Sequence, residues 1–313
     1  MKTAVILVNM GAPSNLDEVK PFLKQLFSDP DIFHFPFGKR GQSFFSSMIA
    51  TLRAPISKTF YQAIGGGSPL SENTIAQADA LQGRLNDVAE LKVFTAQRYW
   101  HPFISEVAEE LRAGDYESII ILPLFPQYST TTTLSIFNEW KQHNHNLPEA
   151  HFIERFYAEA AYNQACAQQI ENAIKEFDKP PHILFSAHSI PQSRVTAGDS
   201  YIDEIYENMA LIMEQLPDNM NHSIAFQSKI GPVKWVGPPL KKELKRLIKA
   251  GVDQVLVYPI SFVSEHVETL FELDIEYAEI AQKLGYKRFV RAATVQTTEK
   301  FIDVLENLVR EKL

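Results

Sequence analysis

Five glutamates at near-helical spacing carry the clearest chemical signal in the sequence. They lie in the segment SEHVETLFELDIEYAEI and are separated by 3, 4, 4 and 3 residues: Glu265, Glu268, Glu272, Glu276 and Glu279. At roughly 100° per residue, all five would fall within about 80° of one another on an α-helix. Like charges at this spacing destabilise a helix by roughly 0.2–0.5 kcal/mol per pair. The glutamates are therefore either a solvated acidic face or a set of carboxylates that bind cations or protons.

A histidine and one of these glutamates are predicted at the same edge of a sheet. His188 directly follows the apolar run 182–187, and Glu268 follows the run 254–260 through a short turn. Functional side chains of open α/β sheets gather at the carboxyl ends of the strands. A histidine and a carboxylate there, with further carboxylates leading away, suit a divalent metal that is received and passed on. A structural histidine, or acid–base hydrolysis by the same pair, are the alternatives.

Short β-branched runs alternate with longer amphipathic segments, which is the pattern of parallel β-α-β units. Strands are predicted at residues 3–9, 91–96, 118–124, 182–187, 223–227, 254–260 and 288–293. Helices are predicted at about 71–87, 103–113, 132–143, 159–177, 199–215, 239–250, 267–284 and 296–312. The predicted fold class is α/β, with doubly wound parallel sheets.

Three pairs of similar segments occur in the same order in the two halves of the chain. They are VILVNMGAP and ILFSAHSIP, TAQRYWHP and AFQSKIGP, and AGDYESIIILPLFPQYSTTTT and AGVDQVLVYPISFVSEHVET. We interpret them as the trace of an ancient duplication that produced two Rossmann-like halves, residues 1–150 and 151–313, with the segment 141–150 as linker. The final helix, 296–313, is a candidate to pack back on the first half.

A ligand cleft is expected between the halves, beyond the carboxyl ends of the strands. The residues expected to line it are Met10, Arg98, Tyr99, Gln127, Tyr128 and Ser129 from the first half and His188, Ser189, Trp235, Glu265, His266 and Glu268 from the second. No P-loop or dinucleotide motif follows a strand and no G-x-S-x-G elbow is present, so neither a nucleotide site nor a serine hydrolase is predicted. The run Ser129–Thr133 could bind a carboxylate or cap the helix that follows.

Composition narrows the class of protein. The chain has 313 residues, of which 45% are hydrophobic and 22% charged, as in ordinary globular proteins. Its net charge of −8 argues against nucleic acid as a partner, because the phosphate backbone requires a basic surface. The single cysteine, Cys166, excludes an internal disulfide and fits a reducing compartment. The short apolar run near the N-terminus is typical of a buried strand, so a cytoplasmic protein is expected.

The segment 30–55 is rich in phenylalanine and contains Lys39, Arg40 and Arg53. Its prolines, glycines and charges interrupt any regular period, so we expect an irregular segment. Aromatic residues at this density are usually core, but a mobile lip over a large, flat, apolar ligand explains the composition as well. Contact with a membrane surface is a second interpretation.

Seven motifs identify a family resemblance. VNMGAP, IGGGSPL, QRYWHP, LPLFPQYSTTTT, FSAHSIP, FQSKIGPVKWVGP and FVSEHVETLFELDIEY occur in the order found in the ferrochelatase family, and the resemblance spans about residues 3–310. It implies the chelatase fold, with two Rossmann-like halves and a porphyrin cleft between them. It also implies insertion of Fe²⁺ into protoporphyrin IX, or into coproporphyrin III as in some bacteria, with release of two protons.

The resemblance assigns roles by position. His188 matches the family's active-site histidine and Glu268 the glutamate facing it, as catalytic residues and metal ligands. His266, Glu272 and Glu276 also match the family's pattern. Glu265 stands where the family often has aspartate, and with Glu272 and Glu276 it is a candidate relay for metal or protons. The porphyrin contacts implied are Met10, Arg98, Tyr99, Ser129 and Trp235.

Further expectations follow from the same resemblance. Met10 is the residue type of the protoporphyrin-using branch, whereas coproporphyrin enzymes tend to have tyrosine there. The chain ends near Leu313 without the cysteine-bearing extension of some members, so no iron–sulfur cluster and no other cofactor are expected, iron being a substrate. A cobaltochelatase of the same fold and a non-catalytic porphyrin or haem carrier are the alternatives.

Overall fold

The computed structural model describes residues 2–33, 38–229, 231 and 233–313. It divides into two compact units, one of residues up to Arg155 together with Ile302–Leu313, and one of Phe156–Phe301. The division falls after the segment 141–150, which contributes the end of a helix and the start of a strand. The chain's last twelve residues, 302–313, group with the first unit.

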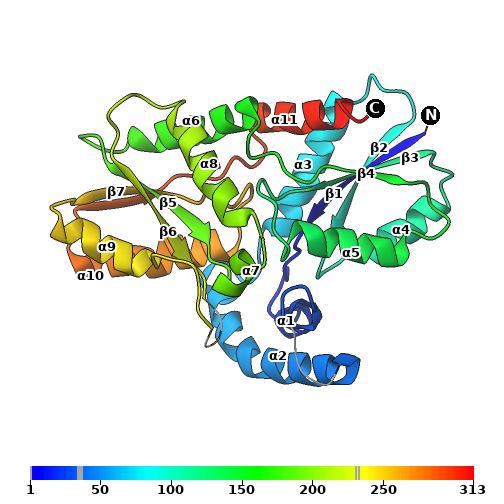
Figure 1. The fold of residues 1–313 in the computed structure, drawn as a ribbon, viewed down its shortest axis with the longest axis horizontal. Coiled ribbons are helices and arrows are strands. Elements are labelled where there is room, and N and C mark those ends of the chain that lie inside the picture. Colours follow the sequence, from blue (N-terminus) through cyan, green and yellow to red (C-terminus); the bar gives the residue numbers. More distant parts are fainter. Residues whose placement is uncertain (1, 34–37, 230, 232) are drawn as a thin grey trace. The chain divides into compact units, whose positions relative to one another are not determined.

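The first unit is a parallel sheet with helices. Its elements are β1 (Thr3–Asn9), α1 (Val19–Ser28), α2 (Gly38–Ala63), α3 (Leu70–Arg84), β2 (Leu91–Gln97), α4 (Ile104–Arg112), β3 (Ser118–Pro123), α5 (Thr133–His143), β4 (Ala150–Phe152) and most of α11 (Glu299–Arg310) (Figure 1). The strand order is β2-β1-β3-β4, and every pair is parallel. All seven residues of β1 are buried, as expected for a central strand covered on both faces.

The second unit repeats this plan. Its elements are α6 (Ala160–Ile174), β5 (His182–His188), α7 (Gln192–Thr196), α8 (Tyr201–Met213), β6 (His222–Gln227), α9 (Leu240–Lys249), β7 (Gln254–Tyr258), the helix η1 (Glu268–Tyr277), α10 (Ala278–Leu284) and β8 (Arg288–Arg291). The strand order β6-β5-β7-β8 is the order of the first sheet, counted from its own first strand. The shared topology supports the interpretation of a duplication.

This strand order places a switch point beside the first strand of each sheet. The chain leaves β5 toward β6 on one side and returns to β7 on the other, and both pairs are parallel. In doubly wound sheets a ligand site lies at such a switch point, outside the carboxyl ends of the strands. Residues that directly follow β5 and β7 are therefore in the position expected for function.

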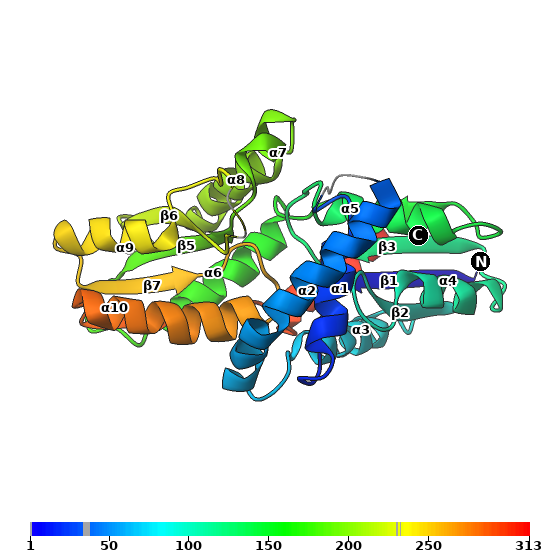
Figure 2. The ribbon, with the colours of Figure 1, turned by 90° about the horizontal axis from the view of Figure 1, so that it is seen from below.

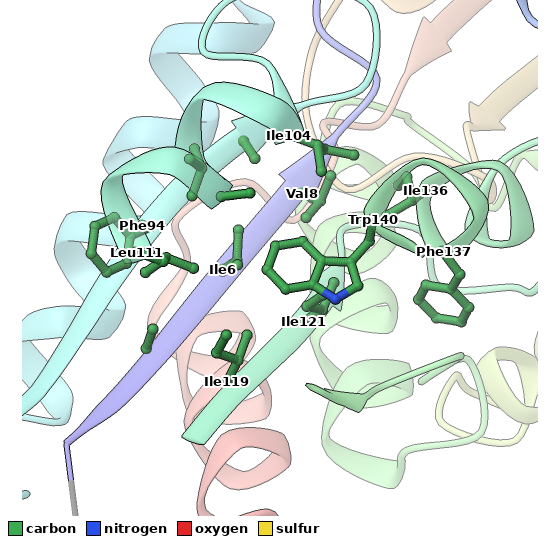
Figure 3. Packing of buried hydrophobic residues seen from close by; sticks show 14 residues of the cluster. Ile6, Val8, Phe94, Ile104, Leu111, Ile119, Ile121, Ile136, Phe137 and Trp140 are labelled. Atoms are coloured by element: carbon green, nitrogen blue, oxygen red, sulfur yellow. The ribbon is translucent and has the colours of Figure 1, made fainter. Parts of the chain in front are cut away.

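Each sheet is held by an apolar layer under its helices. In the first unit, alternate residues of β1, β2 and β3 pack against α4 and α5, with the buried Trp140 at the centre (Figure 3). In the second, Leu184, Ala225 and Val257 pack under α9 and the η1–α10 segment, through Leu244 and Leu273. Burial of roughly 25 cal/mol per Å² of apolar surface makes these layers the main stabilising contribution to each sheet.

The predicted strands and helices are present with small differences at their ends, with two corrections. The segment 267–284 is not one α-helix, because residues Glu268–Tyr277 form a π-helix with i→i+5 hydrogen bonds, followed by α10. The expectation that 30–55 is irregular is wrong for residues 38–55, which belong to α2, whereas residues 34–37 lie outside the described residues. Helices α1 and α7 and strand β4 were not predicted.

Helix α2 has an inverted amphipathic pattern. Its buried positions are mostly small residues, namely Gly41, Ser46, Ala50, Ala54, Ser57 and Tyr61. Its large apolar side chains Phe44, Met48, Leu52 and Ile56 are instead 65%, 41%, 68% and 50% exposed. Their spacing of four residues places them in one stripe along the helix. Small residues let α1 and α2 approach closely, and the two helices lie side by side in both views (Figures 1 and 2).

The glycines of IGGGSPL have a structural role. A Cβ atom on Gly67 would lie 2.1 Å from the carbonyl oxygen of Ser14, a contact that no side chain can make. The backbone N–H of Ser68 donates to Pro13 O at 2.8 Å. The motif thus joins the loop after β1 to the start of α3.

Candidate active site

The centre of the site is an ion pair at the switch point of the second sheet. His188 is the last residue of β5 and Glu268 is the first residue of η1. The Nδ1 atom of His188 lies 2.7 Å from Oε2 of Glu268. The side chains are 34% and 23% exposed, so both remain accessible to a ligand. The sequence-predicted pair is therefore brought together at the predicted edge.

The backbone of His188 is fixed by two hydroxyl groups. Its N–H donates to Oγ of Ser261 at 3.1 Å, and its carbonyl accepts from the Tyr201 hydroxyl at 3.1 Å. The Tyr201 and Ser261 hydroxyls lie 2.6 Å from each other. No hydrogen-bond partner for Nε2 of His188 is found within the part of the chain that the structure describes. The imidazole is thus held on one side and open on the other.

A second carboxylate joins the pair through Ser228, which follows β6. Ser228 Oγ lies 2.9 Å from Oε2 of Glu268 and 2.5 Å from Oε2 of Glu272. Its backbone N–H donates to Oε1 of Glu272 at 3.0 Å, and its φ of 59° is in the left-handed region. One hydroxyl proton cannot serve both carboxylates, but a protonated Glu272 can donate to Ser228 while Ser228 donates to Glu268.

The buried amide of Gln227 contacts the backbone of Glu268 and the carboxylate of Glu272. Its Oε1 accepts from the Ser186 hydroxyl at 2.6 Å, and its Nε2 donates to the Glu268 carbonyl at 3.2 Å and to Oε2 of Glu272 at 3.3 Å. Sequence reasoning missed Ser228 and Gln227 as site residues. A polar Gln-Ser pair directly after the buried strand SIAF was the available signal.

The three ionisable groups differ in proton affinity. Burial raises the pKa of Glu272 to about 7, and repulsion by Glu268 adds to the increase. Burial also disfavours the charged forms of His188 and Glu268, but their mutual attraction outweighs it, so the pKa of His188 is raised and that of Glu268 is lowered. Near neutral pH the site can therefore hold an imidazolium, a carboxylate and a half-protonated carboxyl group.

The five glutamates do not form one uniform stripe. Glu265 precedes the helix and is buried, with Oε1 2.9 Å from Arg291 Nη1 and 2.9 Å from the backbone N of Thr294. Glu276 is exposed, and Glu279 forms an ion pair with Lys283 at 3.1 Å. Repulsion along the helix is thus relieved by different partners at successive positions, and Glu268 and Glu272 alone share the hydroxyl of Ser228.

Two further predicted residues lie near the pair in the second unit. Trp235 forms a β-bridge with Pro191, three residues after His188, and Val236 N donates to Ile190 O. The rings of His266 and Phe262 pack edge to face, with their centroids 4.3 Å apart. Burial lowers the pKa of His266, so its imidazole is neutral at pH 7. Trp235 therefore flanks the segment after β5.

The residues predicted for porphyrin contact in the first unit follow the carboxyl ends of its strands. The N–H of Tyr99 donates to Met10 O at 2.9 Å, and Met10 is partly exposed. Ser129 is buried and its Oγ accepts from Thr131 N at 3.2 Å, a local turn at the start of α5. The side chains of Arg98 and Tyr99 both bind Oδ2 of Asp29. Nη2 of Arg98 lies 3.1 Å from it, and the Tyr99 hydroxyl donates to it at 2.5 Å.

No preformed metal cage is present among the described residues, in which no group of three or more His, Cys, Asp or Glu side chains is arranged to hold a metal ion. His188 and Glu268 together can offer one nitrogen and carboxylate oxygens. Such a set of ligands binds a divalent metal weakly and lets it leave.

A solved structure places the fold in a known class. The sirohydrochlorin chelatase SirB from Bacillus subtilis subspecies spizizenii, in complex with cobalt, aligns with a TM-score of 0.54 at 11% identity, over 99% of this chain and 95% of that chain. At this identity the likeness concerns the fold alone. The chain is therefore an α/β protein with the fold of the chelatases.

The sequence comparisons identify the family. The family model Ferrochelatase matches residues 2–313. The ferrochelatase of Aquifex aeolicus is 44% identical over 100% of both chains, and that of a Synechocystis species is 42% identical over 100% of this chain and 83% of the relative. The chain belongs to the ferrochelatase family and is an enzyme of the metal-chelatase type.

Proposed function

We propose that this chain inserts Fe²⁺ into protoporphyrin IX, forming haem and releasing two protons. The observation that carries the proposal is the His188–Glu268 pair, 2.7 Å apart at the switch point of the second sheet, with Glu272 beside it through Ser228. Membership of the ferrochelatase family supports the same reaction.

The chemistry requires a distorted ring, a proton acceptor and weak metal ligands. A planar porphyrin shields its central nitrogens, so binding energy from the periphery is used to bend the ring. Only neutral imidazole can accept a pyrrole proton or bind iron, and an approaching cation favours that neutral form of His188. Glu268 supplies the negative charge that attracts Fe²⁺. The same charge then stabilises the imidazolium that forms when His188 accepts a pyrrole proton.

Glu272 is suited to take protons away from the pair. Its pKa of about 7 lets it accept and lose a proton near neutral pH. Glu276, exposed further along η1, continues the path toward solvent. Glu265 is already bound to Arg291, which favours a structural role for it within this set.

The apolar stripe of α2 is the proposed surface for the porphyrin ring in the first unit. Phe44, Met48, Leu52 and Ile56 make up half of the large exposed apolar side chains of the described residues. Exposed apolar surface on one face of a helix indicates a binding surface. We further propose contacts of the ring with Met10, Ser129 and Trp235, and preference for protoporphyrin because Met10 leaves an apolar surface.

Peripheral contact with a membrane surface is a second proposal for the same helix. The exposed Lys39 and Arg40 lie at the start of the stripe, as in helices that bind anionic lipid. No helix of the described residues is long and apolar enough to cross a bilayer. Flotation with anionic and neutral vesicles, for wild type and Leu52→Glu, tests the contact, and equal absence of binding to both vesicles would exclude it.

A spectrophotometric assay tests the reaction itself. Purified protein is given Fe²⁺, Zn²⁺ or Co²⁺ under reducing conditions with protoporphyrin IX, coproporphyrin III or sirohydrochlorin. We expect turnover with Fe²⁺ and protoporphyrin, without an added cofactor and without an iron–sulfur cluster. Preference for coproporphyrin, turnover only with Co²⁺ and sirohydrochlorin, or binding without turnover would each replace the proposal by one of its alternatives.

A further inference from the structure

The turn after α1 is built around a buried carboxylate. Asp29 is 3% exposed. Its Oδ2 accepts hydrogen bonds from the hydroxyls of Tyr99 and Ser135, both at 2.5 Å, and lies 3.1 Å from Nη2 of Arg98. Its Oδ1 accepts from the backbone N–H of Asp31 at 2.8 Å. A buried charge is stable only when it is paired and hydrogen-bonded in this way.

The donors to Asp29 lie at the carboxyl end of β2 and at the start of α5. Arg98 and Tyr99 directly follow β2, and Ser135 lies in the first turn of α5. Arg98 is itself fixed, because Nε donates to Ser135 Oγ at 2.8 Å and Nη1 lies 3.3 Å from Glu139. Burial and the nearby charge of Asp29 raise the pKa of Tyr99 well above its usual range, so its hydroxyl remains a donor.

The same turn is bound to α2. The backbone carbonyl of Asp29 accepts from Phe33 N at 2.9 Å. Gln42 of α2 donates through Nε2 to the carbonyls of Phe27 and Phe33, at 3.2 and 2.7 Å. Ser28 donates to Ser46 Oγ at 2.9 Å. Asp29 therefore connects the carboxyl edge of the sheet to the first turns of α2.

We infer that Asp29, Arg98 and Tyr99 are positioning residues that hold α2 on the first sheet, so that its apolar stripe is in place before the porphyrin arrives. This inference rests on the proposed function in assigning the stripe to the porphyrin. It departs from the family-based expectation that Arg98 and Tyr99 contact the porphyrin directly, because both side chains already bind Asp29.

We call the attachment of α2 to the first sheet through Asp29, Arg98 and Tyr99 the anchor. Hydrogen exchange of the ligand-free protein tests this anchor independently of the reaction. Tyr99→Phe removes the hydroxyl and keeps the aromatic ring. Because the lost hydrogen bond is to a charged group, we expect hydrogen exchange in α2 to become about tenfold faster. Ser135→Ala removes another donor to Asp29 and should act in the same direction. Tyr157→Phe is the matched control, because it removes a hydroxyl that donates to Glu207 at 2.8 Å on the surface.

Helix α4 serves as an internal reference, because it packs on the same sheet and contributes none of the hydrogen bonds to Asp29 described above. Faster exchange in α2 with unchanged exchange in α4, in both Tyr99→Phe and Ser135→Ala, supports the anchor. Unchanged exchange in α2, or an equal rise in both helices, overturns it.

Porphyrin binding then separates positioning from direct contact. We expect Tyr99→Phe to raise the porphyrin KM and Kd severalfold with a small change in kcat, and to raise the Kd of a propionate-esterified porphyrin equally. A penalty that disappears with the ester would overturn the inference in favour of direct contact with the propionates. Faster exchange in α2 with an unchanged porphyrin Kd would support the anchor but would show that the stripe does not bind the porphyrin.

Discussion

The Nδ1 atom of His188 and the Oε2 atom of Glu268 lie 2.7 Å apart, although 80 residues separate them in the chain. Parallel pairing of β5 with β7 is what brings them together, because it places the ends of both strands at one edge. The pair controls its own charge, since each group stabilises the ionised form of the other. Four consequences of this geometry, and one of the exposed face of α2, can be tested.

Replacement of His188 should separate binding from chemistry. We expect His188→Ala to lose metal insertion by several orders of magnitude while porphyrin still binds, because the ring is held by apolar area and peripheral contacts. Porphyrin fluorescence titration and the insertion assay measure the two steps. Substantial turnover in this variant would contradict the assignment of His188.

Glu268→Gln should lower both kcat and the pKa of His188. The variant keeps the shape of the side chain but removes the negative charge that favours the imidazolium. NMR titration of the His188 ring measures the pKa, and single-turnover insertion measures the chemistry. An unchanged His188 pKa would show that the pair is not coupled as the distance indicates.

Neutralising the outer glutamates should impair delivery more than chemistry. We expect Glu272→Gln and Glu276→Gln to raise the apparent KM for Fe²⁺ with a milder loss in kcat, which is the pattern of lost binding common to ground and transition states. Glu279→Gln is the control, because Glu279 is already paired with Lys283. If all three behave like wild type, the acidic residues beyond Glu268 are only a solvated face.

Stability should depend on pH through Glu272. Its folded-state pKa of about 7 exceeds the ordinary value of 4.5, so the folded protein binds more protons than the unfolded chain between these values. Glu272 therefore contributes stability at low pH that is lost as pH rises through 7. The stability of Glu272→Gln relative to wild type should increase across this range, by at most about 3 kcal/mol at 1.36 kcal/mol per pKa unit.

Urea unfolding at a series of pH values measures this difference. Glu279→Gln, treated in the same way, gives the background of an exposed glutamate. A difference between Glu272→Gln and wild type that is flat from pH 4.5 to 7 would show that Glu272 is not buried against Glu268 in solution.

The stripe on α2 should respond to porphyrin. We expect hydrogen exchange across α2 to slow when protoporphyrin binds. Leu52→Ser should weaken binding by roughly tenfold, because a leucine side chain that becomes buried on binding contributes about 1.5–3 kcal/mol. Ile75→Ser, at another exposed apolar position on α3, is the control. Equal porphyrin affinity of Leu52→Ser and wild type would assign the stripe to another partner.

Much of the fold could be predicted from the sequence because strand and helix periods are local properties. Apolar runs such as TAVILVN and SIIILPL, separated by amphipathic segments, are typical of parallel β-α-β units, and those strands are present. Helix α2 was not predicted, because it buries small residues and exposes large apolar ones, which reverses the usual hydrophobic pattern. A pattern read from side-chain size assigns the wrong face to such a helix.

The sequence by itself also determined that His188 and Glu268 lie together, because each follows an apolar strand and parallel strands end at one edge. Only the tertiary structure decided what each glutamate does. Four of the five glutamates have different partners, which are Arg291 for Glu265, His188 for Glu268, Ser228 for Glu272 and Lys283 for Glu279, whereas Glu276 is exposed. Spacing along a helix is a local property, whereas burial and charge partners come from residues far away in the chain, and these set the proton affinity of a carboxylate.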